Sequence, residues 1–509
     1  MAQPTTLTWF ARHELGLAWR DWLSMMTAGK KGRELVLVVV LGVIAVIAHA
    51  LAGSIVHSWA AEGVELNKAN LLLLAGGSLL FFTLMLSQAM ESVTRAYYAR
   101  SDLDLILSSP ASSRRLFAVR TAAIAASTMS LSGLIAAPLI NMLAWYDGPQ
   151  WLSAYLVMIC FGALATGISV VAVLALFRTL GPKRTRLISQ IVAAVVGAGF
   201  IIGIQAAAIF YYGSISRMAL FQSPELIAAA PDVDHLLWLP AKAAMGDPFA
   251  LGLLAIASFG FLALVISTSS ASFGHHAVAA AGVSETRQVQ APRNETFRPG
   301  TPRQALRRKE WTLLKRDPWL VSQTLMQILY LLPPALMLWL YYGENSGVMV
   351  VIIPVLVMAS GQLAGGLAWL AISGEDAPDL VATAPVSPRA LVWAKVEAVM
   401  TVMAVVVAPF ILGMALASLQ TAVLAAAFIA LSAGSATAIQ LWFRVQAKRT
   451  MFRRRQVSSR TATFAEAFAS IMWAGTSGLA AAGSWFALAP AILALCVLAA
   501  ARAIAPKEA

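Results

Sequence analysis

The sequence predicts an all-α integral membrane protein with about twelve transmembrane helices, arranged as two parallel-repeat halves of about six. The prediction rests on the apolar composition, the length of the apolar runs and a motif that occurs twice. Of 509 residues, 59% are hydrophobic and only 12% are charged, roughly half the charged fraction of soluble domains. Backbone polar groups in lipid must pair within their own segment, so long apolar runs form helices. These runs do not alternate apolar with polar residues, which excludes a membrane barrel.

Runs long enough to cross a bilayer, which takes about 20 residues, recur along the chain. In the first half they cover 35–56, 71–90, 116–143, 151–177, 188–212 and 249–268. In the second half they cover 321–342, 348–372, 391–416, 422–443, 464–482 and 485–503. About thirty mixed polar residues precede the first run, too many for a secretory signal, so we expect that run to be a membrane helix.

One long polar stretch, residues 269–302, separates the two halves. It is rich in Ser, Gln, Arg and Pro and has no apolar period, which predicts a flexible linker. The domains expected are therefore a first six-span half over 1–268, the linker over 269–302, and a second six-span half over 303–509.

Lysine and arginine gather in alternate loops, which predicts the orientation of the spans. The basic loops include 12–33, 95–115, 178–186, 287–316 and 444–460, whereas the opposite loops have few basic residues and carry acids instead, among them Asp147, Asp232 and Asp247. We expect both termini in the cytoplasm and a multi-pass location in a bacterial inner (cell) membrane. The formal net charge of +13 is then explained by orientation in a lipid bilayer, and no nucleic-acid partner is expected.

A motif after the second predicted span recurs after the eighth. Residues 102–120 read DLDLILSSPASSRRLFAVR and residues 377–395 read APDLVATAPVSPRALVWAK. The alignment needs no gap; it pairs Asp104 with Asp379, Leu105 with Leu380, Pro110 with Pro385, Ser112 with Ser387, Arg114 with Arg389 and Arg120 with Lys395. Acidic residues near the start, including Asp102 and Asp376, suit the positive end of a helix, and the proline ends it. We interpret the element as a short cytoplasmic helix with an apolar face, which would dock a partner.

Weaker matches occur in the same order in both halves. Ahead of the first and seventh spans, Glu14 pairs with Glu310, Arg20 with Arg316 and Asp21 with Asp317. Tryptophan and leucine among basic residues there predict a helix in the headgroup layer. An Ala-Pro pair recurs within the third span of each half and places Pro138 and Pro409 as candidate hinges.

This ordered and doubled pattern resembles the permeases of type-2 ATP-binding-cassette (ABC) exporters, over nearly the whole chain. The resemblance implies in-plane elbow helices at Glu14–Asp21 and Glu310–Asp317. It also implies ATPase-coupling helices around Asp104 and Asp379. The partners implied are cytoplasmic ABC ATPase subunits, in about two copies, which would bind ATP and Mg. The family's short re-entrant helices match Val233–Gly252, with breaks at Pro240 and Gly246, whereas the second half has no room for them.

The chain has no G-x-x-x-x-G-K-[ST] phosphate loop, so we expect no ATP hydrolysis, no cofactor and no catalytic residues in this chain. No Cys or His pattern indicates a metal site, and Cys160 and Cys496 lie in apolar runs. We expect Glu91, Glu397 and Glu466 to pair with nearby Arg or Lys.

Two alternatives remain. An ion-coupled secondary transporter with about twelve spans has a similar parallel repeat, although such carriers place ionisable groups near the midplane. A membrane-embedded lipid-processing enzyme would need clustered Asp, Glu, His or Lys at one membrane face. For the exporter we expect alternating access and, from the lack of buried charge, an apolar or amphipathic cargo.

Overall fold

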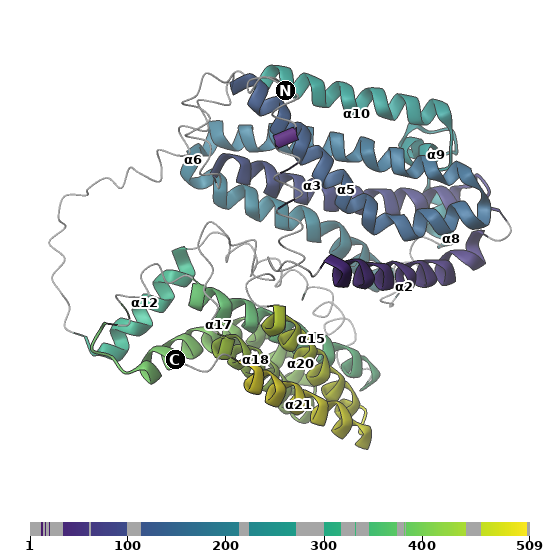
Figure 1. Cartoon of the computed structure of the whole chain (residues 1–509). Helices are drawn as coiled ribbons and strands as arrows, with labels where there is room; N and C mark the ends of the chain where they lie inside the picture. Colours follow the sequence, from purple (N-terminus) through teal and green to yellow (C-terminus); the bar gives the residue numbers. More distant parts are fainter. Residues whose placement is uncertain are drawn as a thin grey trace. The chain divides into compact units, whose positions relative to one another are not determined.

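The computed structural model describes residues 12–13, 16, 20, 34–60, 63–98, 113–212, 223–270, 300–316, 331, 346–373, 381, 383–443 and 460–505. Every regular element within these ranges is a helix, which confirms the all-α prediction for this part of the chain. The chain divides into two compact units, Met1–Ala291 and Pro292–Ala509 (Figure 1). The dividing point falls inside the stretch 269–302.

Nine helical segments among the described residues are long and apolar enough to cross a membrane. They are Lys68–Ala96, Arg114–Asp147, Pro149–Gly181, Leu187–Gln205, Pro248–Ser269, Val350–Ile372, Pro388–Ala417, Leu419–Phe443 and Trp485–Ile504. The chain is therefore a multi-pass membrane protein. The first predicted span lies in α2 (Glu34–Ala60), whose apolar stretch Leu41–His57 is shorter. The eleventh lies in the less apolar α20 (Arg460–Ala481). The seventh, apart from Leu331, is outside the described residues, so the total of twelve stays a prediction.

Unit 1 is built around α6 (Ser153–Tyr212), which consists of two helical segments that meet at Gly181. Helices α3 (Lys68–Tyr98), α5 (Ser113–Asp147) and α10 (Pro248–Ser269) all pack on α6, and α2 packs on α5 (Figure 1). Buried aliphatic and aromatic side chains fill the contacts, for example Leu116, Val173 and Phe177 in one cluster. A short 3-10 turn, Pro149–Leu152, joins α5 to α6 and buries Trp151.

The fourth and fifth predicted spans are two helices that meet directly at a kink within α6, with no loop between them. The interruption is Gly181, with φ 70° and ψ 169°. This combination of angles is almost restricted to glycine, because a Cβ would clash with the backbone. Gly181 thus lets the chain change direction between the two apolar segments while the helix resumes at once.

We expect Gly181→Ala to lower the free energy of unfolding by about 1–3 kcal/mol, the usual cost of holding another residue in such a conformation. Nothing lies within 4 Å of a Cβ built at Gly181, so the loss would report backbone strain alone. Denaturant titration of the full chain in detergent measures it. Gly199→Ala is the matched control, because Gly199 has equally open surroundings and helical angles. Alanine there should stabilise by about 0.5–1 kcal/mol. Equal stabilities of the two variants would contradict the assigned backbone angles.

Short helices cover one end of unit 1, where the sequence predicts re-entrant helices. They are α8 (Pro224–Ala229), η2 (Leu236–Trp238) and α9 (Leu239–Ala244). Pro240 stands in the first turn of α9, where it starts the helix and does not break it. The break follows at Gly246, with φ 95°, and at Asp247, whose carboxylate caps α10. The short broken helices are confirmed, and their depth in a membrane stays a prediction.

An ion pair and a hydrogen bond from Lys68 connect this end of unit 1 to α3. Lys68 Nζ lies 2.9 Å from Asp232 Oδ1 and donates to the carbonyl oxygen of Ala230 at 3.2 Å. The hydrogen bond and then the charge of Lys68 lower the pKa of Asp232. The stability that this ion pair adds to the folded protein is complete above the pH range in which an unperturbed aspartic acid titrates. It is lost as the pH falls through the lowered pKa of Asp232. Because Asp232 is almost fully exposed, the effect is small.

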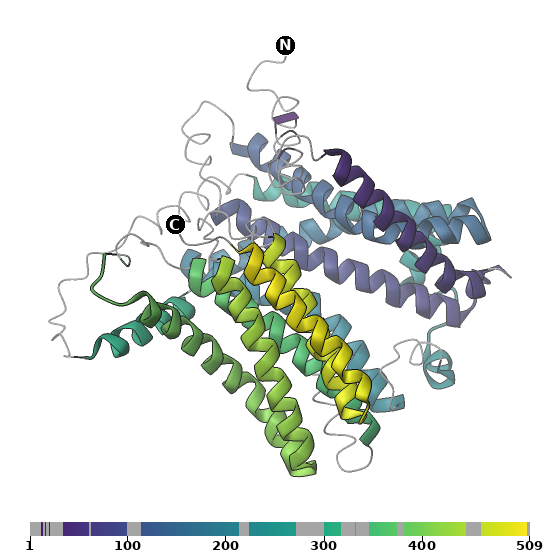
Figure 2. The same cartoon turned by 60° about the horizontal axis from the view of Figure 1, so that its bottom comes forward.

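Unit 2 has three central helices, α15 (Ser346–Ser373), α18 (Leu419–Phe443) and α20, which pack on one another. Helix α17 (Pro388–Ala417) packs on α18, and α21 (Leu488–Ile504) packs on α20 and α18 (Figure 2). A Cβ added at Gly361 would collide with Ser432 and Ser470, which lie on the other two central helices. Glycine therefore lets the three backbones approach closely, as small residues do between membrane helices.

Candidate functional site

The helix α12 (Pro302–Arg316) precedes the second set of spans, where the sequence predicts an elbow helix. It starts with a capping box: Gln304 N donates to Thr301 Oγ1 at 3.4 Å, and Thr301 N donates to Gln304 Oε1 at 3.1 Å. These two bonds satisfy backbone donors that the first helical turn leaves open. Pro302 then occupies the first helical position, which needs no donor. Helix α12 packs against α17 and α15.

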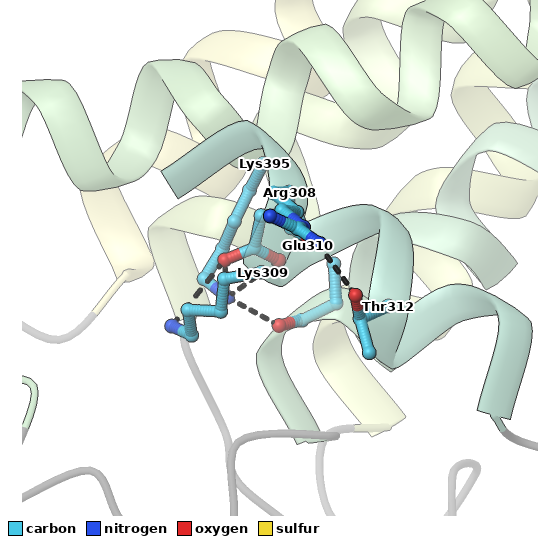
Figure 3. A network of polar contacts seen from close by, with 6 residues as sticks. Arg308, Lys309, Glu310, Thr312 and Lys395 are labelled. Carbon is cyan, nitrogen blue, oxygen red and sulfur yellow. Dashed lines mark hydrogen bonds and ion pairs between the residues drawn. The ribbon is translucent and has the colours of Figure 1, made fainter. Parts of the chain in front are cut away.

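A buried ion pair joins α12 to α17. Lys395 Nζ lies 3.0 Å from Glu310 Oε1 and 3.2 Å from Glu310 Oε2 (Figure 3). Lys309 approaches the same carboxylate at 3.5 Å. Only 1% of the Glu310 side chain and 15% of the Lys395 side chain are exposed. Burying a charge without a partner costs several kcal/mol, so each of these two groups makes the burial of the other possible.

Lys395 also reaches a third helix. Its ammonium group donates to the carbonyl oxygen of Ala371, in the last turn of α15. The last four carbonyls of a helix lack partners within it and form its negative end. A single lysine therefore holds the end of α15, the side of α12 and the start of α17 together. We call this arrangement of Glu310, Lys395 and the Ala371 carbonyl the elbow junction.

A second ion pair, between Arg307 and Glu397, connects the same two helices at the surface. It confirms the expectation that Glu397 pairs with a nearby basic residue. Glu91 likewise lies 3.6 Å from Arg95. Glu466 is buried between α20 and α18 and accepts a hydrogen bond from Gln440.

The second copy of the repeated motif leads directly into the elbow junction. Turns follow Val381, and Ser387 then caps α17, its hydroxyl accepting from Ala390 N at 3.3 Å. Pro388 occupies the first turn of that helix. Pro385 precedes this cap and the exposed Arg389 follows it. The sequence thus stops one helix and starts the next within a few residues, two turns before Lys395.

Several predicted site residues lie outside the described residues, and their roles stay predictions. They are Glu14, Asp21, Asp102, Asp104, Leu105, Pro110, Ser112, Asp317, Asp376, Asp379 and Leu380. Among the others, Arg20 donates to the Gly16 carbonyl at 3.2 Å, Arg114 is exposed near the start of α5, and Arg316 ends α12. Pro138 and Pro409 lie inside α5 and α17.

The first half carries a buried cation at the position that matches Lys395. This residue, Arg120, is 4% exposed on α5. The repeat aligns Glu14 with Glu310, and Glu14 lies outside the described residues.

Sequence reasoning missed a polar chain inside unit 1. Tyr155 Oη donates to Asn141 Oδ1 at 2.7 Å, and Asn141 Nδ2 lies 3.1 Å from His49 Nε2. These hydrogen bonds link the helices α6, α5 and α2. The signal was available, since His, Asn and Tyr within apolar runs are uncommon and often functional. Which of these residues contact one another depends on how the helices pack, because Asn141 and His49 are about 90 residues apart in the sequence.

Within the described ranges, no three His, Cys, Asp or Glu side chains come together as a metal site requires. Comparisons with protein-family models, curated proteins and solved structures found no match for this chain. The functional conclusion therefore rests on the residues and their geometry.

Proposed function

We propose that this chain is the transmembrane permease of an ATP-driven ABC exporter of the type-2 class, energised by separate cytoplasmic ATPase subunits. The chain itself binds no nucleotide in this proposal. It sits in a bacterial inner membrane with both termini in the cytoplasm.

The elbow junction is the observation that carries the proposal. A permease must transmit the movement of a cytoplasmic motor to its spans, which requires a rigid link at the cytoplasmic end. The buried Glu310–Lys395 pair provides such a link between α12 and α17, and the Ala371 carbonyl adds α15. The repeated motif lies between α15 and α17. A force on this motif would therefore act on three helices that move together.

The polar chain of unit 1 supports a second candidate, an ion-coupled carrier. An imidazole can take up and release a proton, and Asn141 and Tyr155 form the hydrogen-bonded path that leads away from His49. If transport by the purified chain in vesicles responds to a proton gradient in the absence of any ATPase, and His49→Gln abolishes that response, the carrier is the correct assignment.

The exporter predicts an ATPase partner that depends on both copies of the motif. We expect the tagged chain, purified from its own membranes in mild detergent, to retain a protein with a phosphate loop. Asp104→Ala combined with Asp379→Ala should reduce the retained ATPase at least tenfold, because a charge at the start of each docking helix is lost. Each single variant should have an intermediate effect. Quantitative mass spectrometry of the purified complex measures the ratio.

Asp234→Ala is the control, since Asp234 is an exposed aspartate in a loop predicted on the opposite face of the membrane. It should retain the full amount of ATPase. An unchanged ratio in the double variant would show that these helices do not couple to an ATPase.

A further inference from the structure

Unit 2 contains a cavity of about 1140 Å³ between α17, α18 and α21. Pockets that hold drug-sized ligands usually measure roughly 300–1,000 Å³, so this cavity accommodates a larger molecule. Its walls are mainly aliphatic and aromatic, and two arginines are its charged residues. No acidic residue is among the described residues that line it.

The two charged residues lie at one end of the cavity. Arg389 stands in the first turn of α17 and Arg502 in the last turn of α21. Helix α18 ends at the same place, with Phe443 in the cavity wall. The Arg502 guanidinium lies over the Trp442 ring, 5.4 Å from its centroid. This cation–π contact holds the charge at the rim.

The apolar part extends from that end along α17. Val392, Val396 and Met400 follow Arg389 on the same face of the helix and all line the cavity. Eleven residues of helix separate Arg389 from Met400, a rise of about 16 Å. That length is close to half of the roughly 30 Å hydrocarbon core. The cavity therefore has a cationic rim and an apolar wall about one leaflet deep.

The sequence that follows α18 is strongly basic. Directly after Phe443 come Arg444, Lys448, Arg449, Arg453, Arg454 and Arg455. On the topology predicted from Lys and Arg, this is the cytoplasmic end. Basic pockets between membrane helices on that side suit anionic headgroups, because each Lys or Arg adds attraction to the anionic leaflet.

We propose that this cavity binds an anionic phospholipid of the cytoplasmic leaflet. The lipid phosphate pairs with Arg389 and Arg502, and an acyl chain lies along Val392, Val396 and Met400. A guanidinium fork matches phosphate oxygens in pairs. A zwitterionic headgroup gains less, because none of the described residues that line the cavity is a carboxylate that could receive its cationic group. The site requires no transport activity, so it stands apart from the exporter proposal.

The test compares phosphatidylglycerol with phosphatidylcholine of the same acyl chains. Each lipid is titrated into the full-length delipidated protein, and bound lipid is counted by native mass spectrometry. We expect phosphatidylglycerol to bind at least about fivefold more tightly. Arg389→Gln and Arg502→Gln should each lower the affinity for phosphatidylglycerol about fivefold, and together about 30-fold, in line with the attraction per basic residue. Phosphatidylcholine binding should hardly change.

Three variants refine the result. Arg389→Lys with Arg502→Lys keeps both charges and should retain most of the preference. Arg114→Gln removes the arginine that the repeat aligns with Arg389, outside the cavity, and should leave binding unchanged. Gly434→Leu places a side chain into the apolar part, where nothing lies within 4 Å of a built Cβ. This substitution should weaken the binding of both lipids.

Three outcomes would overturn the proposal. Unaltered phosphatidylglycerol binding in the double Gln variant would show that the two arginines do not bind the lipid. An equal loss in Arg114→Gln would indicate general charge attraction. Complete displacement of the lipid by millimolar inorganic phosphate, with full binding in Gly434→Leu, would identify a site for free anions in place of a lipid.

Discussion

Glu310→Ala is expected to lower the free energy of unfolding of unit 2 by about 3–5 kcal/mol, the usual cost of breaking a buried ion pair from one side. The substitution leaves the Lys395 ammonium buried with the Ala371 carbonyl and without its carboxylate. Helix α12 should detach from α17 first, because the pair is its buried polar contact with that helix. Chemical denaturation of the full chain in detergent micelles measures the stability loss.

Two further variants make this result specific. Arg307→Ala removes the exposed pair with Glu397 on the same helices and should cost at most about 1 kcal/mol. Glu310→Leu combined with Lys395→Met replaces both charges by apolar groups and should recover most of the loss. If Glu310→Ala and Arg307→Ala prove equally mild, Glu310 is solvated and the elbow junction is not a rigid link.

Gly361→Leu should destabilise unit 2 by about 3 kcal/mol or more, at the upper end of the range for overpacked cores. A Cβ at Gly361 already collides with Ser432 and Ser470. Both serines are buried on neighbouring helices, so α15 would have to move away from α18 and α20 together. We expect a lower melting temperature and faster proteolysis of the purified protein.

Gly434→Leu is the matched control for this effect. Gly434 is also a helical glycine of unit 2, but a Cβ there meets nothing within 4 Å. The same substitution should leave the melting temperature nearly unchanged while reducing lipid binding. Comparable destabilisation at both glycines would show that α15, α18 and α20 are less closely packed than described.

The helical segments could be predicted from sequence because their cause is local. An apolar run of about 20 residues must satisfy its own backbone in lipid, whatever its neighbours are. The ends of the helices were harder to predict where a single residue decides them. The stretch around Gly181 contains charged and turn-forming residues and resembles a loop, yet one glycine with positive φ suffices to join one helix directly to the next.

The doubled motif identified the region of the elbow junction but not its contacts. The same order of motifs in both halves singled out Glu310 and Lys395 as members of repeated elements. It could not show that they meet, since 85 residues separate them. The hydrogen bonds among His49, Asn141 and Tyr155 were missed for a related reason: each residue stands in a different apolar run, and only helix packing brings the three together.

The sequence by itself determined a helical multi-pass membrane chain and the doubled order of its elements, and its Lys and Arg placement predicts an orientation. The tertiary structure decided which charges are buried together, where glycine permits three helices to touch, and how two arginines come to share one cavity. The physical reason is the range of the interactions. Burial in lipid and helix formation act within a segment, whereas ion pairs and close packing depend on which segments become neighbours.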